Sequence, residues 1–267
     1  MAGKRQKTPT ASSGNAVPES AARGPATGIP DYGLDSPLRV RHVFSRGAWT
    51  LAGALLVWYM NRVEYPGPAL TLLLVLGTLA LLNFLAGAHL VWSSRSAKLV
   101  LRDRLLDSLT LRGDEKVLDA GCGRGLMAIG AAKRLHSGKV TAVDIWDPLA
   151  LSGNSGDAAR ENAKLEGVAD RVRIENADMM KLTYPAGSFD VVVSTAAIHH
   201  MQEEPDRDQA VRELFRMLRP GGTVLVFDVA NTKRYAQILR ECGAADVAVK
   251  SEGFLWCRPG QSVTARK

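Results

Sequence analysis

The sequence of 267 residues has few cysteines, no internal repeat and no segment of the signal-peptide type. Its three cysteines, Cys122, Cys242 and Cys257, are too few and too scattered for a disulfide scaffold or a zinc cluster, and they favour a reducing compartment. The first apolar run begins too late for a signal peptide, and no small-residue cleavage site follows it. Hydrophobic residues make up 46% of the chain and charged residues 23%, which excludes a wholly disordered protein.

Net charge is absent from the large C-terminal part, although the whole chain carries +7. Residues 1–46 contribute +4, residues 47–92 contribute 0, residues 93–104 contribute +3 and residues 105–267 contribute 0. The basic excess therefore flanks the apolar region. This pattern argues against nucleic acid as a partner and indicates a membrane anchor whose basic flanks face the inner leaflet.

Large apolar side chains are rare in residues 1–36, which are rich in Ala, Ser, Gly, Pro and Thr. Such a segment buries too little surface to offset the entropy that it loses on ordering. We therefore interpret residues 1–40 as a disordered tail, residues 41–95 as a membrane anchor and residues 96–267 as a folded domain.

The region from Tyr65 to Ser94 contains 30 residues without a charge. About 20 apolar residues suffice to cross the hydrocarbon core of a bilayer. Tyr65 and Trp92 stand near the two ends, where aromatic residues gather in membrane proteins. The length of the run favours a transmembrane helix over a buried core helix.

A shorter apolar run, Gly47 to Asn61, has 15 residues between Arg46 and Arg62. As a helix it is about 22 Å long, and the two arginines can extend it by snorkelling. The Pro-Gly-Pro sequence at 66–68 separates the two runs. We predict a helical hairpin that places both basic flanks in the cytoplasm. The alternative is a first helix that lies in the membrane interface and a single crossing, which places one basic flank on the opposite side.

From residue 96 onward, strand patterns alternate with helix patterns, which predicts an α/β domain with a parallel sheet and helices on both faces. Two final strand patterns, 246–254 and 262–267, are joined by a short connection that suits an antiparallel pair. The other strand patterns are residues 115–121, 139–145, 172–178, 189–196 and 223–229, and the helix patterns are residues 97–109, 125–136, 156–167, 208–222 and 234–244.

A glycine-rich turn, VLDAGCGRG at 117–125, joins the first of these strands to a helix. Gly121, Gly123 and Gly125 permit positive φ angles and let a ligand approach the backbone closely. The amides at the start of the helix then point toward that ligand. The motif follows Asp119 and reads G-x-G-x-G, whereas nicotinamide-dependent enzymes favour G-x-G-x-x-G.

Carboxylates also follow the next two strand patterns. Asp144 ends the second strand and can accept hydrogen bonds from vicinal ribose hydroxyls. Asp178 follows the third strand and can accept a bond from an adenine amino group, while Met179 and Met180 can pack on the ring. Because the carboxyl ends of parallel strands meet at the crevice where open α/β sheets bind ligands, we expect these acids to share one pocket.

Residues 97–267 resemble the class I S-adenosylmethionine-dependent methyltransferases. The resemblance rests on VLDAGCGRG, VTAVDI, NADMMKLTYPAGSFDVVVSTAAIHH and LRPGGTVLVFD. It implies a Rossmann-like, doubly wound α/β fold with a seven-stranded, mostly parallel sheet whose last strand is antiparallel. It also implies a methyltransferase activity with S-adenosyl-L-methionine as the cofactor.

The resemblance implies a role for each matching position. Asp119 and the glycine turn would hold the amino-acid end of the cofactor, Asp144 its ribose, and Asp178 with Met179 its adenine, while Ser194 would lie near the transferred methyl group. The implied cofactor-binding residues are Asp119, Gly121, Cys122, Gly123, Asp144, Ile145, Asp178, Met179 and Ser194.

Catalysis by this family implies direct displacement at an activated methyl group, in which the protein aligns the reactants and excludes water. His199 and His200 are the local candidates for a general base, because an unperturbed histidine titrates near neutral pH. A packing or capping role for both histidines stays open. We predict no metal site. The sequence also lacks the Asn/Asp/Ser-Pro-Pro-aromatic motif of enzymes that methylate planar amines, which disfavours a nucleobase amine as acceptor.

One segment departs from the family pattern. After Asp144 the stretch IWDPLALSGNSGDAARENA carries extra residues before the next helix. Trp146 and this loop either cover the adenosine or touch the substrate, or they form an inert surface insertion.

Together these features predict a membrane-anchored methyltransferase whose catalytic domain is cytoplasmic and whose acceptor is an amphipathic small molecule or lipid. The alternative is a non-catalytic protein that binds S-adenosylmethionine as a sensor or assembly partner. An NAD(P)-dependent oxidoreductase agrees less well, because it does not predict Asp178. The sequence indicates no particular protein partner.

Overall fold

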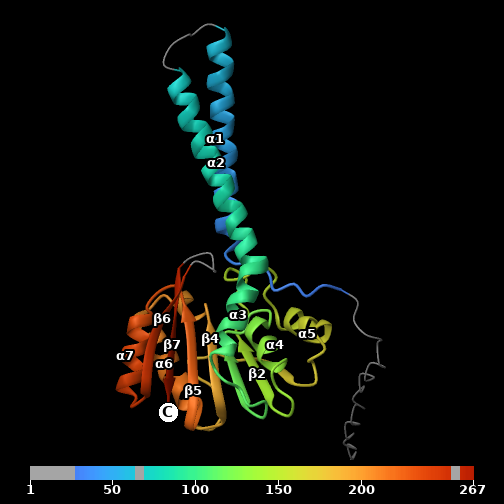
Figure 1. Cartoon of the computed structure of the whole chain (residues 1–267), viewed down its shortest axis with the longest axis vertical. Coiled ribbons are helices and arrows are strands. Elements are labelled where there is room, and N and C mark those ends of the chain that lie inside the picture. Colours follow the sequence, from blue (N-terminus) through green and yellow to red (C-terminus); the bar gives the residue numbers. More distant parts are fainter. Residues whose placement is uncertain (1–27, 64–68, 254–258) are drawn as a thin grey trace, which may run out of the picture.

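The computed structural model describes residues 28–63, 69–253 and 259–267. They form a helical hairpin that stands on an α/β domain (Figure 1). Residues 1–27 of the predicted tail, the predicted break at 66–68 and part of the predicted connection between the last two strands lie outside the described residues.

The hairpin consists of α1 (Pro37–Val63) and α2 (Ala69–Trp92), which pack side by side. Phe44 and Phe84 meet across the pair with ring centroids 6.2 Å apart. Gly87 permits this approach, because a Cβ at that position would lie 2.7 Å from the Phe44 ring. The predicted pair of helices is therefore present, whereas its insertion into a membrane stays a prediction. By length and composition, one helix among the described residues could span a bilayer, Leu70–Asp107.

This helix of 38 residues runs from the hairpin into the domain without a break. A π-helical segment, Ser93–Ala97, connects α2 to α3 (Lys98–Asp107). A π turn widens the helix locally and changes the direction of the side chains that follow it. The hairpin and the domain are thus joined by a continuous helix and not by a coil linker.

The domain is built on a seven-stranded sheet with the strand order β3-β2-β1-β4-β5-β7-β6. Neighbouring strands are parallel except where β7 pairs with β5 and β6, so the predicted mostly parallel, Rossmann-like sheet is confirmed. The strands are β1 (Lys116–Ala120), β2 (Lys139–Asp144), β3 (Val172–Asn176), β4 (Phe189–Thr195), β5 (Leu218–Asp228), β6 (Ala245–Gly253) and β7 (Gly260–Arg266).

Apolar residues alternate between two cores because successive side chains of a strand point to opposite faces. Val191 and Val193 pack into the core under α3, α4 (Leu126–Ala132) and α5 (Gly156–Leu165). Val192 packs into the other core, under α6 (Glu204–Met217) and α7 (Thr232–Glu241). Both faces of the sheet are therefore covered, as a parallel sheet requires.

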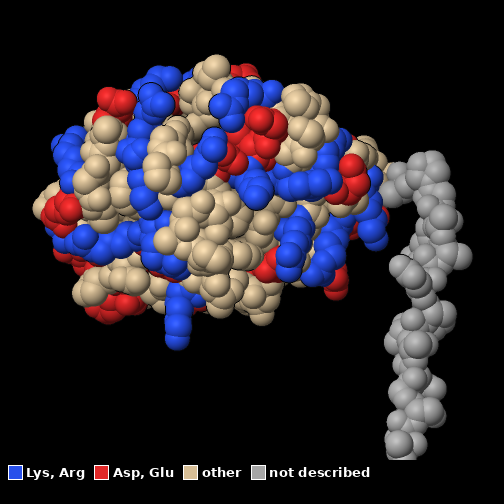
Figure 2. Space-filling view, turned by 90° about the horizontal axis from the view of Figure 1, so that it is seen from below, with Lys and Arg blue, Asp and Glu red and all other residues tan. Residues whose placement is uncertain are grey.

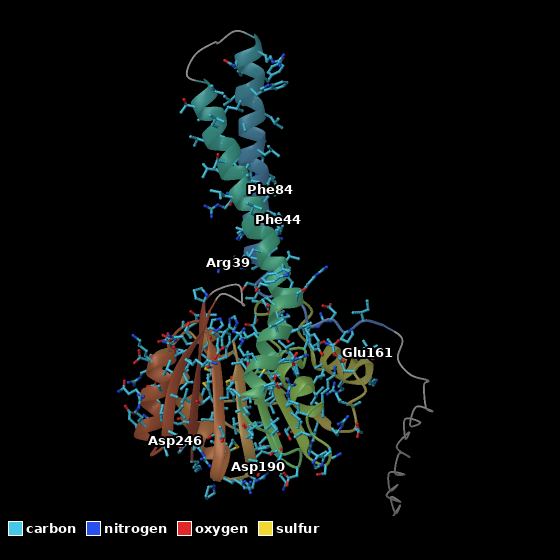
Figure 3. All side chains as sticks on the ribbon, in the orientation of Figure 1. Arg39, Phe44, Phe84, Glu161, Asp190 and Asp246 are labelled. Atoms are coloured by element: carbon cyan, nitrogen blue, oxygen red, sulfur yellow. The ribbon has the colours of Figure 1, made fainter. Side chains whose placement is uncertain are left out.

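The carboxyl edge of the sheet faces the hairpin. The chain descends through α3, so β1 begins at the far edge and ends next to the hairpin (Figure 1). Figure 3 shows Arg39 between the hairpin and the domain, whereas Asp190, near the start of β4, lies at the far edge. The face seen in Figure 2, opposite the hairpin, carries interspersed acidic and basic side chains, as a solvated surface does.

Residues 31–36, here called the strap, lie on the domain immediately before α1. This differs from the predicted tail at 1–40, because residues from 28 onward have a defined structure and α1 already begins at Pro37. Tyr32 is 8% exposed, and its hydroxyl donates to Glu166 at 2.9 Å. The ammonium group of Lys98, whose side chain is 2% exposed, donates to the carbonyl oxygens of Tyr32 (2.8 Å) and Gly33 (2.7 Å).

We expect Lys98→Met to release the strap, because two buried carbonyl groups and Asp35, 3.5 Å from the ammonium, would lose their partner. The loss corresponds to about 1–3 kcal/mol. The measurement is the rate at which chymotrypsin cuts the full chain after Tyr32. Lys164→Met, on the exposed side of α5, is the matched control and should leave that rate unchanged. Equal protection of Tyr32 in both variants would contradict the role assigned to Lys98.

Candidate functional site

A pocket of about 470 Å³ lies at the carboxyl edge of the sheet, between the strand ends and the strap. Its size is within the range of small-molecule sites. Of the predicted site residues, only Ser194 is absent from its walls. The walls include Asp119, Gly121, Cys122, Gly123, Asp144, Ile145, Asp178, Met179, His199 and His200.

The two carboxylate oxygens of Asp119, at the end of β1, have different surroundings. Oδ2 accepts a hydrogen bond from the Ala128 amide in the first turn of α4, at 2.8 Å. Oδ1 is buried and has no hydrogen-bond partner in the protein. Burial raises the pKa of Asp119 to about 7. A buried, unpaired carboxylate oxygen in a pocket wall indicates that the ligand brings a positively charged or hydrogen-bond-donating group.

The glycine turn is attached to the neighbouring strand. The amides of Gly121 and Cys122 both donate to the Val143 carbonyl oxygen, at 2.8 and 3.1 Å. Gly121 has φ +78°, and a Cβ there would lie 2.3 Å from the Ala197 Cβ and 2.8 Å from the Met179 Cε. Both the conformation and the space therefore require glycine at this position.

Asp144, at the end of β2, lies beside this turn. Its Oδ2 accepts from the Gly123 amide at 2.8 Å, and its Oδ1 accepts from the Trp146 amide at 2.6 Å. Each carboxylate oxygen has further acceptor capacity, so vicinal hydroxyls can still bind. Asp178, after β3, is exposed, and Met179 beside it is 9% exposed. Because β1, β2 and β3 are neighbours in the sheet, Asp119, Asp144 and Asp178 follow one another along the pocket.

His199 also lines the pocket, and it lies on the 3-10 turn Ile198–His200 that follows β4. Its Nδ1 is 2.5 Å from Oδ1 of Asp228, a contact that lacks good hydrogen-bond geometry, and its backbone amide donates to Oδ2 at 3.0 Å. Asp228 is 1% exposed and also accepts from the Tyr235 hydroxyl at 3.3 Å. Burial, and then the neighbouring His199, lower the pKa of His200. His199 is thus the histidine whose protonated form has a carboxylate beside it.

Ser194, which was predicted to follow the fourth strand and to bind the cofactor, lies within β4 and does not line the pocket. It is fully buried in β4, and its neighbour Thr195 lines the pocket instead. Since adjacent strand residues point to opposite faces, one position along β4 decides which hydroxyl faces the ligand.

Asp228 and the strap were missed by sequence reasoning. Asp228 ends β5 in the motif LVFD, so the rule that located the other strand-end acids could also have found it. Tyr32 and Asp35, which line the pocket, stand in a segment whose small and polar composition resembles that of a disordered tail. No metal site is apparent, because the described residues contain no group of three or more His, Cys, Asp or Glu side chains that could hold an ion.

The raised pKa of Asp119 predicts how the affinity for S-adenosylmethionine depends on pH. Below about pH 7 the carboxyl group is mostly protonated and its attraction for a cationic ligand is lost. We expect the affinity to fall by about tenfold per pH unit below 7 and to be level above it. Asp119→Asn should bind weakly at every pH. Calorimetric titration of both proteins from pH 5 to 8 measures this dependence, and a flat profile for the unchanged protein would exclude the assigned role.

Gly121→Ala should abolish measurable S-adenosylmethionine binding, because its Cβ overlaps Ala197 and Met179 and its φ is positive. The matched control is Gly243→Ala, which has φ +85° but no atom within 4 Å of the new Cβ. The control carries the same backbone strain without the steric overlap. Equal binding by the two variants would show that the pocket is elsewhere.

Residues 117–222 match the family profile described as a methyltransferase domain. The 27-O-demethylrifamycin SV methyltransferase of Amycolatopsis mediterranei is 38% identical over 175 residues, which make up 61% of this chain and 60% of that protein. The chain therefore spans less than two thirds of this relative.

Among solved structures, the cyclase SpnF has a TM-score of 0.55 at 20% identity, covering 65% of this chain and 82% of that chain. A methyltransferase from Aquifex aeolicus has a TM-score of 0.50 at 20% identity, covering 61% and 88%. These two likenesses concern the fold alone. Residues 117–222 therefore resemble a methyltransferase domain, and the chain has a Rossmann-like fold similar to that of solved S-adenosylmethionine-dependent methyltransferases, with the strand-end acids and the glycine turn in one pocket.

Proposed function

We propose that this protein is a membrane-anchored O-methyltransferase that transfers a methyl group from S-adenosylmethionine to a hydroxyl group of an amphipathic small molecule or lipid. The observation that carries this proposal is the composition of one pocket. The acids at the ends of β1 and β2 and after β3 form one wall, and His199, backed by the buried Asp228, belongs to the same pocket.

The acids at the strand ends, together with Met179, fit the chemical groups of the cofactor. The unpaired Oδ1 of Asp119 matches the ammonium group of the methionine portion, Asp144 matches the ribose hydroxyls, and Asp178 with Met179 matches the adenine. The bound cofactor supplies a methyl group already activated by a sulfonium charge, so the acceptor needs only orientation and loss of its proton. The strap adds Tyr32 and Asp35 to the wall and reduces the access of water.

His199 is suited to take that proton. During methyl transfer the imidazole of His199 would accept the proton that the acceptor hydroxyl group releases. Asp228 then lies beside the imidazolium and stabilises its charge, while its contacts with Tyr235 and the His199 amide hold it in place. Asp228 is a positioning residue, since it touches the histidine and does not line the pocket.

The proposed acceptor group is supported by the rifamycin relative, whose name describes methylation at an oxygen. An alcohol is a poor nucleophile until it loses its proton, so a site for this acceptor needs a base. The paired His199 and Asp228 supply one. A thiolate or an amine acceptor would make little use of this pair.

The anchor is supported by the apolar surface of α2 and by the charges at the base of the hairpin. Leu74, Leu81 and Leu85 are each more than half exposed, which is unfavourable in water and favourable in lipid. Arg39 is exposed at the end of the hairpin next to the domain (Figure 3), and Arg95 is exposed in the π-helical segment that joins α2 to α3. By the positive-inside rule this end is cytoplasmic, which places the domain in the cytoplasm.

We expect His199→Ala to lower the rate of methyl transfer by about 10²–10⁴-fold at neutral pH, because the acceptor loses its base. Asp228→Asn should lower the rate less, since the imidazole stays but its charge is no longer stabilised. The measurement uses the full chain in detergent, methyl-labelled S-adenosylmethionine and a membrane extract as the source of acceptors. His136→Ala, an exposed histidine outside the pocket, should transfer at the unchanged rate.

Cofactor affinity is measured for each variant in parallel and should stay the same, which separates the chemical step from binding. A His199→Ala protein that transfers label at the original rate across pH would remove the base from the mechanism. An unchanged protein that binds S-adenosylmethionine but labels no fraction of the extract would instead be a non-catalytic binding protein.

A further inference from the structure

The loop between β2 and α5, residues 145–155, is the segment that departs from the family pattern. It is hydrogen-bonded to strap residues 34–36, immediately before α1. The Leu34 amide donates to the Ser152 hydroxyl at 2.7 Å, and the Ser152 amide donates to the Leu34 carbonyl at 3.1 Å. The Ser36 amide donates to the Ala150 carbonyl at 3.4 Å. Because α1 begins at the next residue, these bonds hold the loop directly beside the hairpin.

The same region exposes large apolar side chains. Leu149 is 68% exposed, Ile145 is 65% exposed and Leu38, in the first turn of α1, is 46% exposed. Single exposed apolar residues are ordinary on a protein surface. These three belong to segments that the hydrogen bonds above join, and Ile145 also lines the pocket. The rim of the pocket next to the hairpin is therefore partly apolar.

Basic side chains lie on α1 beside Leu38. Arg39 is exposed and also lines the pocket, and Arg41 is exposed. Pro37 and Arg41 are separated by about 6 Å along the helix axis. Exposed arginines beside an apolar helix attract anionic headgroups. Within the rim, Leu38 lies within one helical turn of Arg39 and Arg41 on α1.

We propose that the β2–α5 loop is a membrane-contact element and that Leu149 and Ile145 enter the headgroup region of an anionic bilayer. The pocket then opens toward lipid, and the acceptor reaches His199 from within the bilayer. This inference rests on the proposed function and narrows its substrate class. The acceptor is an amphiphile dissolved in the membrane that carries the methylated hydroxyl at its polar end. The extra residues of the loop are what allow its apolar side chains to reach the lipid.

The contact is tested with the full chain in nanodiscs of phosphatidylcholine and phosphatidylglycerol. An environment-sensitive nitrobenzoxadiazole label is attached at Leu149→Cys, in a background with Cys242→Ser and Cys257→Ser, while the buried Cys122 is kept. The control label is at Lys164→Cys, on the exposed face of α5. We expect the emission at position 149 to shift to the blue and to be quenched by nitroxide-labelled lipid, whereas the emission at position 164 does neither.

A label at position 149 as hydrated as the one at position 164 would overturn the proposal. A blue shift without quenching by the nitroxide lipid would also overturn it, because it would place the loop against protein, such as a second copy of the chain. These readouts do not depend on methyl transfer, so they can fail while the proposed enzymatic activity holds.

A second measurement links the contact to turnover. Leu149 does not line the pocket, so Leu149→Ser should leave the affinity for S-adenosylmethionine unchanged. We expect it to lower the initial rate of label transfer into the lipid fraction of the membrane extract by about fivefold, since an apolar contact with the bilayer is lost. Val249→Ser, an exposed apolar position on β6, is the matched control and should not change the rate. Equal rates for both variants would show that the loop does not guide the acceptor.

Discussion

The hydrogen bond between the Ala128 amide and the Asp119 carboxylate is the interaction on which the site depends. It joins the end of β1 to the first turn of α4, and it therefore fixes the glycine turn between them. The second oxygen of the carboxylate is left without a partner in a buried place, which is an unfavourable state that a ligand can relieve. Burial of this carboxylate also raises the pKa of Asp119.

The strap is a second connection between the hairpin and the domain, beside the continuous helix from α2 to α3. Its backbone carbonyls bind the buried ammonium group of Lys98, while Tyr32 and Asp35 extend the wall of the pocket. The segment then continues into α1, so the pocket wall and the hairpin belong to one stretch of chain. A buried lysine without its carbonyl partners would be strongly destabilising, and the strap is therefore part of the folded domain.

Periodicity and strand-end chemistry predicted most of the domain, because both depend on local sequence. The strands, most of the helices and the pocket acids Asp119, Asp144 and Asp178 were predicted in this way, although residues 218–222, predicted as the end of a helix, belong to β5. The order of the strap could not be predicted, since it depends on Lys98, 65 and 66 residues along the chain from its partners. Local composition carries no information on such a contact.

Two features of the site depend on tertiary geometry in the same manner. Thr195 and not Ser194 lines the pocket because of the orientation of β4 relative to its neighbours. A pattern of alternating residues does not determine which of these two adjacent side chains faces the pocket. The pairing of His199 with Asp228 requires the ends of β4 and β5 to be adjacent, and the sequence does not state which strands are neighbours.

The uninterrupted helix from α2 through the π turn to α3 has a kinetic consequence. A flexible tether would let the domain sample a wide volume around its attachment point. A continuous helix holds the domain in one orientation relative to the hairpin. Under the proposed anchoring, encounters with the acceptor would occur by lateral diffusion in two dimensions. Turnover would then follow the number of acceptor molecules per unit area of membrane, and the bulk concentration of a water-soluble analogue would have little influence.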